Sequence, residues 1–250
     1  MYKHALVVGG HGTIGQIMVA NLNKLLNPPI VTVANRQSHH AQLAQTADVI
    51  FFTVKPQDFS AAATATKPGI SNQLIISLMA GVSTTTLVQQ LNNQRVIRAM
   101  PNLPAKIGLG MTVWTATTAS TTTDKEFVQA LFRLMGQQLE VMNDQMIDQA
   151  TAVSASGPAY LFLLAEQLLQ AASYIGLPAD QARLLVTETL RGASTLLADS
   201  AASPASIRAQ VTSTGGTTAA AITTLPLAEL QQYWNTAIMA AYQRAKELSH

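Results

Sequence analysis

A run of glycines near the N-terminus has the spacing of a phosphate-binding turn. The run Gly10-His-Gly-Thr-Ile-Gly15 directly follows the apolar residues 5–8 and opens a segment compatible with a helix. In such a turn the first glycine allows a tight bend, the second lets the backbone approach a pyrophosphate, and the third lets a helix pack closely on a strand. Amide groups at the helix N-terminus then face the negative charge. The spacing indicates a dinucleotide site, with a purely structural glycine turn as the alternative; its residues are Gly10, His11, Gly12, Thr13, Ile14 and Gly15.

The residues after the second apolar run bear on which dinucleotide binds. A site that prefers NAD carries an acid about twenty positions after the glycine turn, where it binds the ribose 2′-hydroxyl. This chain has Asn35 and Arg36 there. A guanidinium favours a 2′-phosphate, so NADPH is the expected cofactor, with NADH as the alternative if Arg36 is a solvated loop residue. His39 and His40 follow and are expected to lie on the surface, with additional positive charge at low pH as the alternative.

A second run of small polar residues lies in the other half of the chain. Residues 211–218 read Val-Thr-Ser-Thr-Gly-Gly-Thr-Thr and precede an expected helix. Backbone amides and hydroxyl groups at a helix N-terminus together suit a small carboxylate. Ordinary capping of the helix by Ser213 or Thr217 is the alternative, and the residue types do not decide between the two.

Metal-dependent or triad-based chemistry finds no support in the residues. The chain has no cysteine, which excludes thiolate metal sites and disulfides, and its five histidines lack ligand spacing. No Ser-His-Asp arrangement can be recognised. A bound cofactor would therefore have to carry the reaction.

Composition excludes several classes of protein. The chain has 250 residues of which 48% are apolar, enough for one large domain or two ordinary ones without disulfides. Fifteen basic and thirteen acidic residues leave a formal charge of +2 and no basic stripe, so nucleic-acid binding is not expected. We find neither a signal peptide nor a membrane-spanning run, and expect a cytoplasmic protein with no membrane partner.

The elements that must position these residues change character along the chain. Short runs that are apolar on both faces suit parallel strands covered by helices, and further strands are expected at 111–114 and 139–142 around a helix at 124–135. From Pro158 onward apolar residues recur at helical spacing, which predicts helices there and at 179–198, 216–223 and 227–248. The sequence thus predicts an open α/β sheet followed by helices; the expected parallel strands are residues 5–8, 30–33, 49–54, 74–77 and 95–98.

Six segments in this order resemble the pyrroline-5-carboxylate reductase family over essentially the whole length of the chain. Two of them are the glycine turn at 10–15 and the polar run at 211–218 already described. The other four are Thr53-Val-Lys-Pro56, Ser77-Leu-Met-Ala-Gly-Val82, Arg98-Ala-Met-Pro-Asn102 and Ser154-Ala-Ser-Gly-Pro-Ala-Tyr160.

The resemblance implies an N-terminal Rossmann-like NAD(P)-binding domain, residues 1–148, and a C-terminal all-α dimerisation and substrate domain, residues 149–250. It implies reduction of 1-pyrroline-5-carboxylate to L-proline by hydride transfer from NAD(P)H, the last step of proline biosynthesis. It also implies a homodimer, in some relatives part of a larger ring, whose active site spans two chains. By this resemblance Val54, Lys55, Pro56 and Ala80 contact the cofactor, Met100 and Asn102 approach the nicotinamide and substrate, Ser213, Thr214, Gly215, Gly216 and Thr217 bind the substrate, and Thr218 faces the imine nitrogen.

The chain departs from the family pattern in three places. The segment between Arg36 and Asp48 is short, Thr214 stands where a proline is usual, and Ala155 stands where a glycine is usual. These departures leave two alternatives: a weak or inactive nucleotide-binding paralogue with a structural or regulatory role, and a reductase of a related cyclic imine. Retention of Gly215, Gly216 and Thr218 favours an active enzyme. Two charged residues, Arg98 and Glu166, are expected to be structural and solvated, respectively, rather than catalytic.

Overall fold

The computed structural model describes residues 2–248 and consists of two compact units. The first unit runs to Pro158 and includes the chain again from Ile238, whereas the second covers Ala159–Ala237. The first unit holds all the strands of the described chain, and the second holds only helices. The domain boundary expected from the sequence lies at residue 148. The first compact unit extends beyond this boundary to Pro158 and also includes the end of the last helix.

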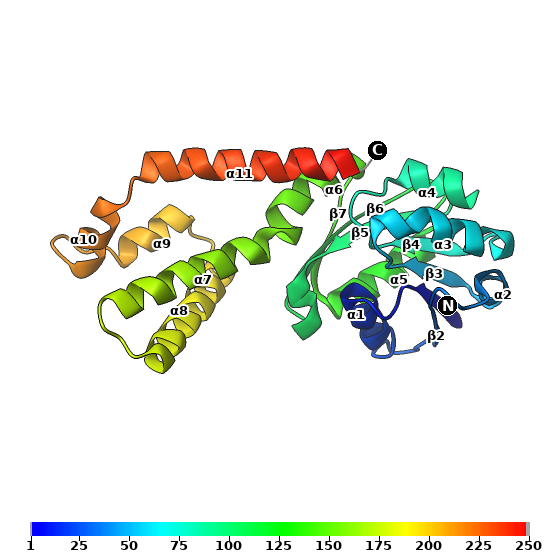
Figure 1. Ribbon diagram of the computed structural model, residues 1–250, viewed down its shortest axis with the longest axis horizontal. Helices are drawn as coiled ribbons and strands as arrows, with labels where there is room; N and C mark the ends of the chain where they lie inside the picture. The colour runs from blue at the N-terminus through cyan, green and yellow to red at the C-terminus, as the bar shows by residue number, and fades with distance from the viewer. Residues whose placement is uncertain (1, 249–250) are drawn as a thin grey trace. The chain divides into compact units, whose positions relative to one another are not determined.

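The first unit is built on one seven-stranded sheet with the order β2-β1-β3-β4-β5-β6-β7 (Figure 1). β1 to β5 are parallel, β6 is antiparallel to β5, and β7 is parallel to β6. The chain leaves β1 for β2 on one side and returns to β3 on the other, and ligands of such sheets bind at the carboxyl ends of the strands beside this reversal. The strands are β1 (His4–Val8), β2 (Ile30–Ala34), β3 (Val49–Phe52), β4 (Leu74–Ser77), β5 (Val96–Pro101), β6 (Gly110–Ala116) and β7 (Gly136–Glu140).

Helices cover both faces of the sheet, as the strands that are apolar on both faces predict. Alternate residues of β1 face opposite layers: Val7 packs with α1 and α5, whereas Leu6 packs with α2, α3 and α4. The α/β fold predicted for this part is therefore confirmed. The helices are α1 (Thr13–Leu22), α2 (His40–Thr46), α3 (Phe59–Thr66), α4 (Thr84–Leu91), α5 (Thr122–Arg133) and α6 (Asp144–Ala150), with short turns η1 (Pro56–Asp58), η2 (Lys67–Gly69) and η3 (Leu103–Ile107) and a π-helical segment η4 (Thr151–Ala155).

The last strand differs from the sequence prediction. We expect it at residues 139–142, but β7 spans Gly136–Glu140. It pairs with β6 from Gly110 opposite Gly136 onward, and the two backbones approach so closely there that a side chain on Gly136 would collide with Gly110. The apolar pattern of 139–142 misses this start because β7 begins with glycine and glutamines, which carry no strand signal of their own.

The second unit and its flanking segments contain five helices, four of which the sequence predicts. The additional helix is α9, whose start is marked by Ser203 as N-cap and Pro204 at the first turn, a signal present in the sequence. Within residues 2–248 no helix is both long and apolar enough to cross a membrane. The five are α7 (Gly157–Tyr174), α8 (Ala179–Asp199), α9 (Pro204–Gln210), α10 (Thr217–Thr224) and α11 (Leu227–Leu248).

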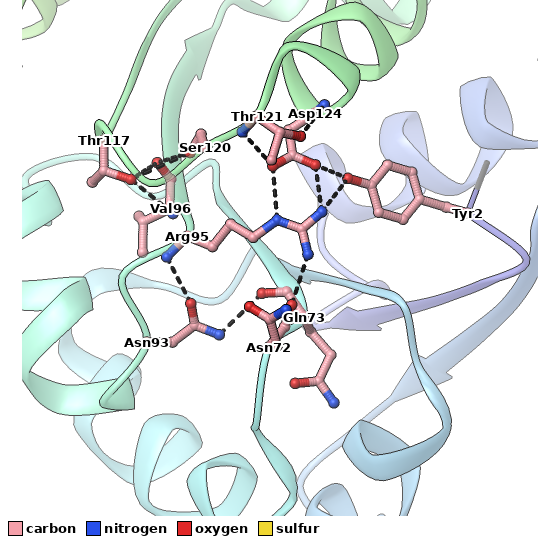
Figure 2. Close-up of polar contacts among 10 residues, drawn as sticks. All are labelled: Tyr2, Asn72, Gln73, Asn93, Arg95, Val96, Thr117, Ser120, Thr121 and Asp124. Carbon is pink, nitrogen blue, oxygen red and sulfur yellow. Dashed lines mark hydrogen bonds and ion pairs between the residues drawn. The ribbon is translucent and has the colours of Figure 1, made fainter.

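A buried ion pair links the segments before β1 and β5 to the start of α5. It lies at the amino ends of these strands, opposite the edge of the sheet where the glycine turn lies. Figure 2 shows Arg95, Tyr2 and Asp124 in mutual contact, with Nε and Nη2 of Arg95 at 2.8 and 2.6 Å from the two Asp124 carboxylate oxygens. Tyr2 also donates its hydroxyl hydrogen to Asp124. Burial opposes ionisation of Asp124, but hydrogen bonds from Arg95, Tyr2 and the Thr121 amide outweigh it and hold the pKa of Asp124 at about 2. The Arg95–Asp124 pair therefore stabilises the fold in its ionised form.

Replacing Asp124 with asparagine is expected to destabilise the protein in a pH-dependent manner. The folded pKa of Asp124, about 2, lies below the ordinary value of about 3.9, so ionisation stabilises the fold above about pH 4 and stops doing so as the pH falls to about 2. Urea unfolding of both proteins over this range is expected to give a free-energy difference that is largest near neutral pH and shrinks in acid. A difference that stays constant with pH would contradict the assignment.

Candidate active site

The glycine turn follows β1 and is built on close backbone packing. Gly9 adopts φ +87°, and a side chain there would meet the backbone nitrogen of Val54 at 2.8 Å. The sequence prediction gives the tight bend to Gly10, but the left-handed residue is Gly9, whereas Gly10 needs to be glycine because Val33 lies 2.7 Å from where its Cβ would stand. The turn thus fits between β1, β2 and the segment after β3.

The two later glycines of the turn differ in how closely other atoms pack against them. Gly12 is the N-cap of α1 and makes no side-chain capping bond. A Cβ on Gly12 would have only Gly9 O nearby, at 3.5 Å, so this part of the backbone is open to a ligand. Gly15 packs against Gly10, whose Cα would lie 2.5 Å from an added Cβ. The first turn of α1, which includes Thr13 and Ile14, therefore presents its amides at the edge of the sheet.

A cavity of about 660 Å³ opens at the carboxyl ends of β1, β2 and β3, beside this turn. Its lining brings together two groups of residues that the sequence assigns to the cofactor, from the glycine turn and from the ends of β2 and β3. Pro56 begins η1 just beyond, and Ala80 is half-buried in the segment that follows β4. The predicted residues that line the cavity are His11, Gly12, Asn35, Arg36, Val54 and Lys55.

Arg36 extends from the end of β2 into solvent at the rim of this cavity. Its side chain is 87% exposed, and Nη2 lies 3.0 Å from an oxygen of Asp58. Such an exposed pair contributes little to stability, so the guanidinium remains available to an anion. The preceding side chain, Asn35, accepts a hydrogen bond from the Gln37 amide and shapes the turn that carries Arg36.

His40 corrects the expectation that both histidines lie on the surface. His39 is exposed, but His40, the first residue of α2, is only 7% exposed and lines the cavity with Arg36. Its two ring nitrogens lie within hydrogen-bond distance of Asn35 O and Thr66 Oγ1, which accounts for a polar ring in a buried position. The sequence carries no local signal for this because Thr66 comes from α3.

The end of β5 carries Met100 and Asn102, the two residues expected near the nicotinamide. Met100 is half-buried and packs with Val113 and Ile147. Asn102 uses both ends of its carboxamide within the fold: Oδ1 accepts from the Met111 amide at 2.9 Å, and Nδ2 donates to Ser154 O at 3.2 Å. Asn102 therefore fastens β5 to β6 and to the π-helical segment η4. Such π-helical turns occur often at functional sites.

Arg98, two residues before Met100, is a buried structural cation, as the sequence predicts. It is 1% exposed and donates to Asp144 at 2.9 Å and to Asp148 at 2.6 Å. Asp144 in turn accepts from the amide and hydroxyl of Thr84 at the start of α4. This cluster joins α4, β5 and α6. Sequence reasoning missed both aspartates, because nothing local relates them to Arg98, which lies 46 and 50 residues earlier in the chain.

The polar run in the second unit forms a turn that leads into α10. Gly216 is the N-cap of α10 and has no side-chain capping bond, so capping by Ser213 or Thr217 is not what the structure contains. The Gly216 amide donates to Ser213 O at 3.0 Å, which closes the turn, and Ser213, Thr214, Gly215 and Thr217 are exposed while Thr218 is half-exposed. This turn keeps hydroxyl groups and helix amides available, which suits a carboxylate. Glu166 lies exposed on α7, as expected.

Comparison with known proteins relates both halves of the chain to reductases. Residues 144–248 match the family described as pyrroline-5-carboxylate reductase dimerisation, and residues 15–81 match NADP oxidoreductase coenzyme F420-dependent. A pyrroline-5-carboxylate reductase of Arabidopsis thaliana is 35% identical over 83% of this chain and 75% of its own length. One of Corynebacterium melassecola is 33% identical over 97% of each chain. The chain belongs to the pyrroline-5-carboxylate reductase family.

Solved structures agree with this membership. A pyrroline-5-carboxylate reductase from Coxiella burnetii matches with a TM-score of 0.88 and 31% identity, over 98% of each chain. The Plasmodium falciparum pyrroline carboxylate reductase, solved with NADP bound, matches with a TM-score of 0.87 and 24% identity over 100% of this chain and 98% of its own, which shows a shared fold. The Rossmann-like sheet and the helical C-terminal part are thus the family's fold.

Gly12 offers a way to test dinucleotide binding in this family member without disturbing the fold. In Gly12→Ala the new methyl has room, with Gly9 O at 3.5 Å, but it would stand where the backbone is expected to approach a pyrophosphate. We expect an unchanged melting temperature and NADPH binding weakened by about tenfold, measured by fluorescence titration. Gly15→Ala, which places a methyl against Gly10 at 2.5 Å, is expected to lose thermal stability as well. Unchanged NADPH affinity in Gly12→Ala would exclude this turn as the phosphate site.

Asn102 can be tested by a substitution that keeps one of its two hydrogen bonds. Asn102→Asp retains an acceptor for the Met111 amide but replaces the donor to Ser154 O by a carboxylate oxygen. The free energy of unfolding is expected to fall by about 1–3 kcal/mol, measured in urea, because a half-buried carbonyl loses its partner and faces a charge. Asn27→Asp makes the same change at an exposed loop position and is expected to have almost no effect. Equal free energies of unfolding of Asn102→Asp and Asn27→Asp would show that the hydrogen bond to Ser154 O does not stabilise the fold.

Proposed function

We propose that the chain is a cytoplasmic enzyme that reduces 1-pyrroline-5-carboxylate to L-proline with NADPH, the last step of proline biosynthesis. The observation that carries this proposal is the identity of 33% over 97% of both chains with a pyrroline-5-carboxylate reductase. A glycine turn open to a pyrophosphate and an uncapped helix N-terminus open to a carboxylate, both present here, are the two features that this reaction requires.

The cofactor would bind along the cavity beside β1 to β3. The turn of residues 10–15 would hold its pyrophosphate, and Arg36 would hold the 2′-phosphate in exchange for Asp58, which favours NADPH over NADH. Val54, Lys55, Pro56 and Ala80 would lie along the ribose and nicotinamide. NADPH supplies a hydride when bound. The relative from Plasmodium falciparum, solved with NADP bound, supports this choice.

The substrate would be held by the turn before α10. The amides at the start of α10, together with Ser213 and Thr217, would bind the carboxylate, since helix N-termini favour anions. Thr218 would hydrogen-bond the imine nitrogen and fix which face of the ring is presented. Reduction adds a hydride to the imine carbon and a proton to the nitrogen, and this proton arrives with the substrate or from water. Met100 and Asn102 would border the reacting atoms, the latter chiefly by positioning η4.

A homodimer would complete this site, with residues 1–148 contributing the cofactor side and residues 149–250 the dimer and substrate side. The helical unit supports this because it leaves large apolar side chains uncovered: Leu161 is 57% exposed, Leu184 63% and Tyr233 66%. Contiguous apolar surface is typical of protein interfaces. The match of residues 144–248 to a dimerisation family points the same way. The solution mass of the purified chain tests this part of the proposal.

The proposed reaction is tested by mixing purified protein with 1-pyrroline-5-carboxylate and NADPH and following the absorbance of the reduced nicotinamide. We expect consumption that needs both compounds and is slower with NADH. Binding of NADPH without consumption would indicate a nucleotide-binding paralogue instead. Consumption of NADPH only with a six-membered or other cyclic imine would indicate the same hydride transfer to a different substrate.

A further inference from the structure

His40 lies where it can affect the part of the cofactor that distinguishes NADPH from NADH. Its ring is 7% exposed and lines the same cavity as Asn35 and Arg36. Nε2 lies 2.7 Å from the carbonyl oxygen of Asn35, the residue before Arg36. Nδ1 lies 3.2 Å from Oγ1 of Thr66 on the neighbouring helix α3. The ring thus links the turn that carries Arg36 to the body of the domain.

The partners of the ring determine where its hydrogens lie. A carbonyl oxygen only accepts, so Nε2 must donate to Asn35 O. Thr66 donates its single hydroxyl hydrogen to Ala62 O at 2.7 Å, which leaves Thr66 Oγ1 as an acceptor toward Nδ1. Both ring nitrogens therefore face acceptors. Only the doubly protonated imidazolium satisfies both bonds, and this form carries a positive charge.

We propose that His40 is a specificity-determining residue that acts as an imidazolium: it holds the turn of residues 35–38 in place and adds positive charge beside Arg36 at the site of the 2′-phosphate. This inference rests on the proposed cofactor. Histidine changes its charge between about pH 5 and pH 8. Loss of a proton from this imidazolium would remove its charge and one of its two hydrogen bonds, so the contribution of His40 to the preference for NADPH over NADH depends on that proton.

The charged groups around His40 do not neutralise a positive charge on its ring. Asp58 is the one carboxylate among the described residues that line the cavity, and it is engaged by Arg36. The other titratable lining groups are His11, Arg36 and Lys55. Of the elements packed against α2, α3 carries no titratable side chain, η2 carries Lys67 and β1 carries His4. No buried acid of the described lining neutralises the ring, so a bound phosphate would be its counter-ion.

The first test reads the ring directly in cofactor-free protein. Nitrogen-15 NMR of labelled histidines, with the His40 signals assigned through the His40→Gln variant, is expected to show hydrogens on both ring nitrogens at about pH 6. A His40 ring with one unprotonated nitrogen at this pH would overturn the inference. That result would mean that the Thr66 hydroxyl turns toward Nδ1 and away from Ala62.

The second test measures dissociation constants of NADPH and NADH for the native protein, His40→Gln and His39→Gln between about pH 5.5 and pH 8.5. The 2′-phosphate has its own ionisation near pH 6, which all three proteins share. Relative to His40→Gln, the native protein is expected to favour NADPH at least about fivefold more at the acidic end, with the difference vanishing at the alkaline end. His39→Gln, which alters the exposed neighbour, is expected to follow the native profile.

Coinciding profiles of the native protein and His40→Gln would overturn the inference. So would a His39→Gln profile that matches His40→Gln, because the effect would then not belong to the buried ring. Failure of the proposed reaction is separable from both: no turnover of 1-pyrroline-5-carboxylate, together with the expected pH-dependent preference for NADPH, would refute the reaction and support the role of His40.

Discussion

Replacing Arg98 with methionine is expected to lower the free energy of unfolding by about 3–5 kcal/mol. The guanidinium is 1% exposed and lies 2.9 Å from an Asp144 oxygen and 2.6 Å from an Asp148 oxygen. The variant leaves both carboxylates in the protein without their shared cation, and the Asp148 side chain is only 7% exposed. Removing one partner of a buried pair costs more than the pair contributes, because the remaining charge stays desolvated.

Urea unfolding at neutral pH measures this effect, with Arg36→Met as the matched control. Arg36 makes the same kind of contact with Asp58, but its side chain is 87% exposed. Its loss is expected to change the free energy of unfolding by less than about 1 kcal/mol. Similar losses in the two variants would show that burial of the Arg98 cluster has no special energetic role.

Replacing Thr218 with valine is expected to lower kcat about 100-fold, the cost typical of losing one donor to the reacting group. Valine has nearly the same shape, so the change removes the hydroxyl and little else. Thr218 lies in the first turn of α10, whose N-cap Gly216 uses no side chain, so the helix does not depend on the hydroxyl for capping. NADPH affinity is expected to stay unchanged because the cavity beside the glycine turn, where we propose that NADPH binds, is lined by residues of the first unit.

Steady-state kinetics of the reductase reaction separate this role from a structural one. Thr223→Val makes the same substitution near the end of α10, where the hydroxyl bonds only to Ala219 and Ala220 carbonyls. That variant is expected to retain the native kcat. A native kcat in Thr218→Val would remove Thr218 from the site, and equal losses in both variants would indicate damage to the helix instead.

The parts of this fold that sequence alone predicts are those with a strong local signal. The runs around Val7, Phe51 and Ile76 are apolar on both faces and become central parallel strands, buried on both sides. The glycine spacing predicts a tight turn at the end of β1, and the structure has one there: Gly10 and Gly15 leave no room for a side chain, whereas Gly12 is open. The helix at 227–248 is predicted to the residue, since its apolar residues recur at helical spacing.

The parts that sequence does not predict depend on partners far along the chain. His40 is buried because Thr66 and Asn35 offer it acceptors, and nothing next to His40 in the sequence indicates this. Asp144 and Asp148 accept hydrogen bonds from Arg98 of β5 because α6, which carries both aspartates, packs against this strand. β7 begins at Gly136, where its backbone closely approaches Gly110, and its first residues are a glycine and two glutamines, which do not predict a strand. Local pattern predicts elements; it does not predict which side chains meet.

We propose that this chain transfers a hydride from NADPH to the imine carbon of 1-pyrroline-5-carboxylate. The most direct measurement uses NADPH that carries deuterium at the transferred position of C4, followed by mass spectrometry and NMR of the product. We expect L-proline with one deuterium on the ring carbon that was the imine carbon. Proline without deuterium, or no proline in the presence of protein that binds NADPH, would contradict the claim.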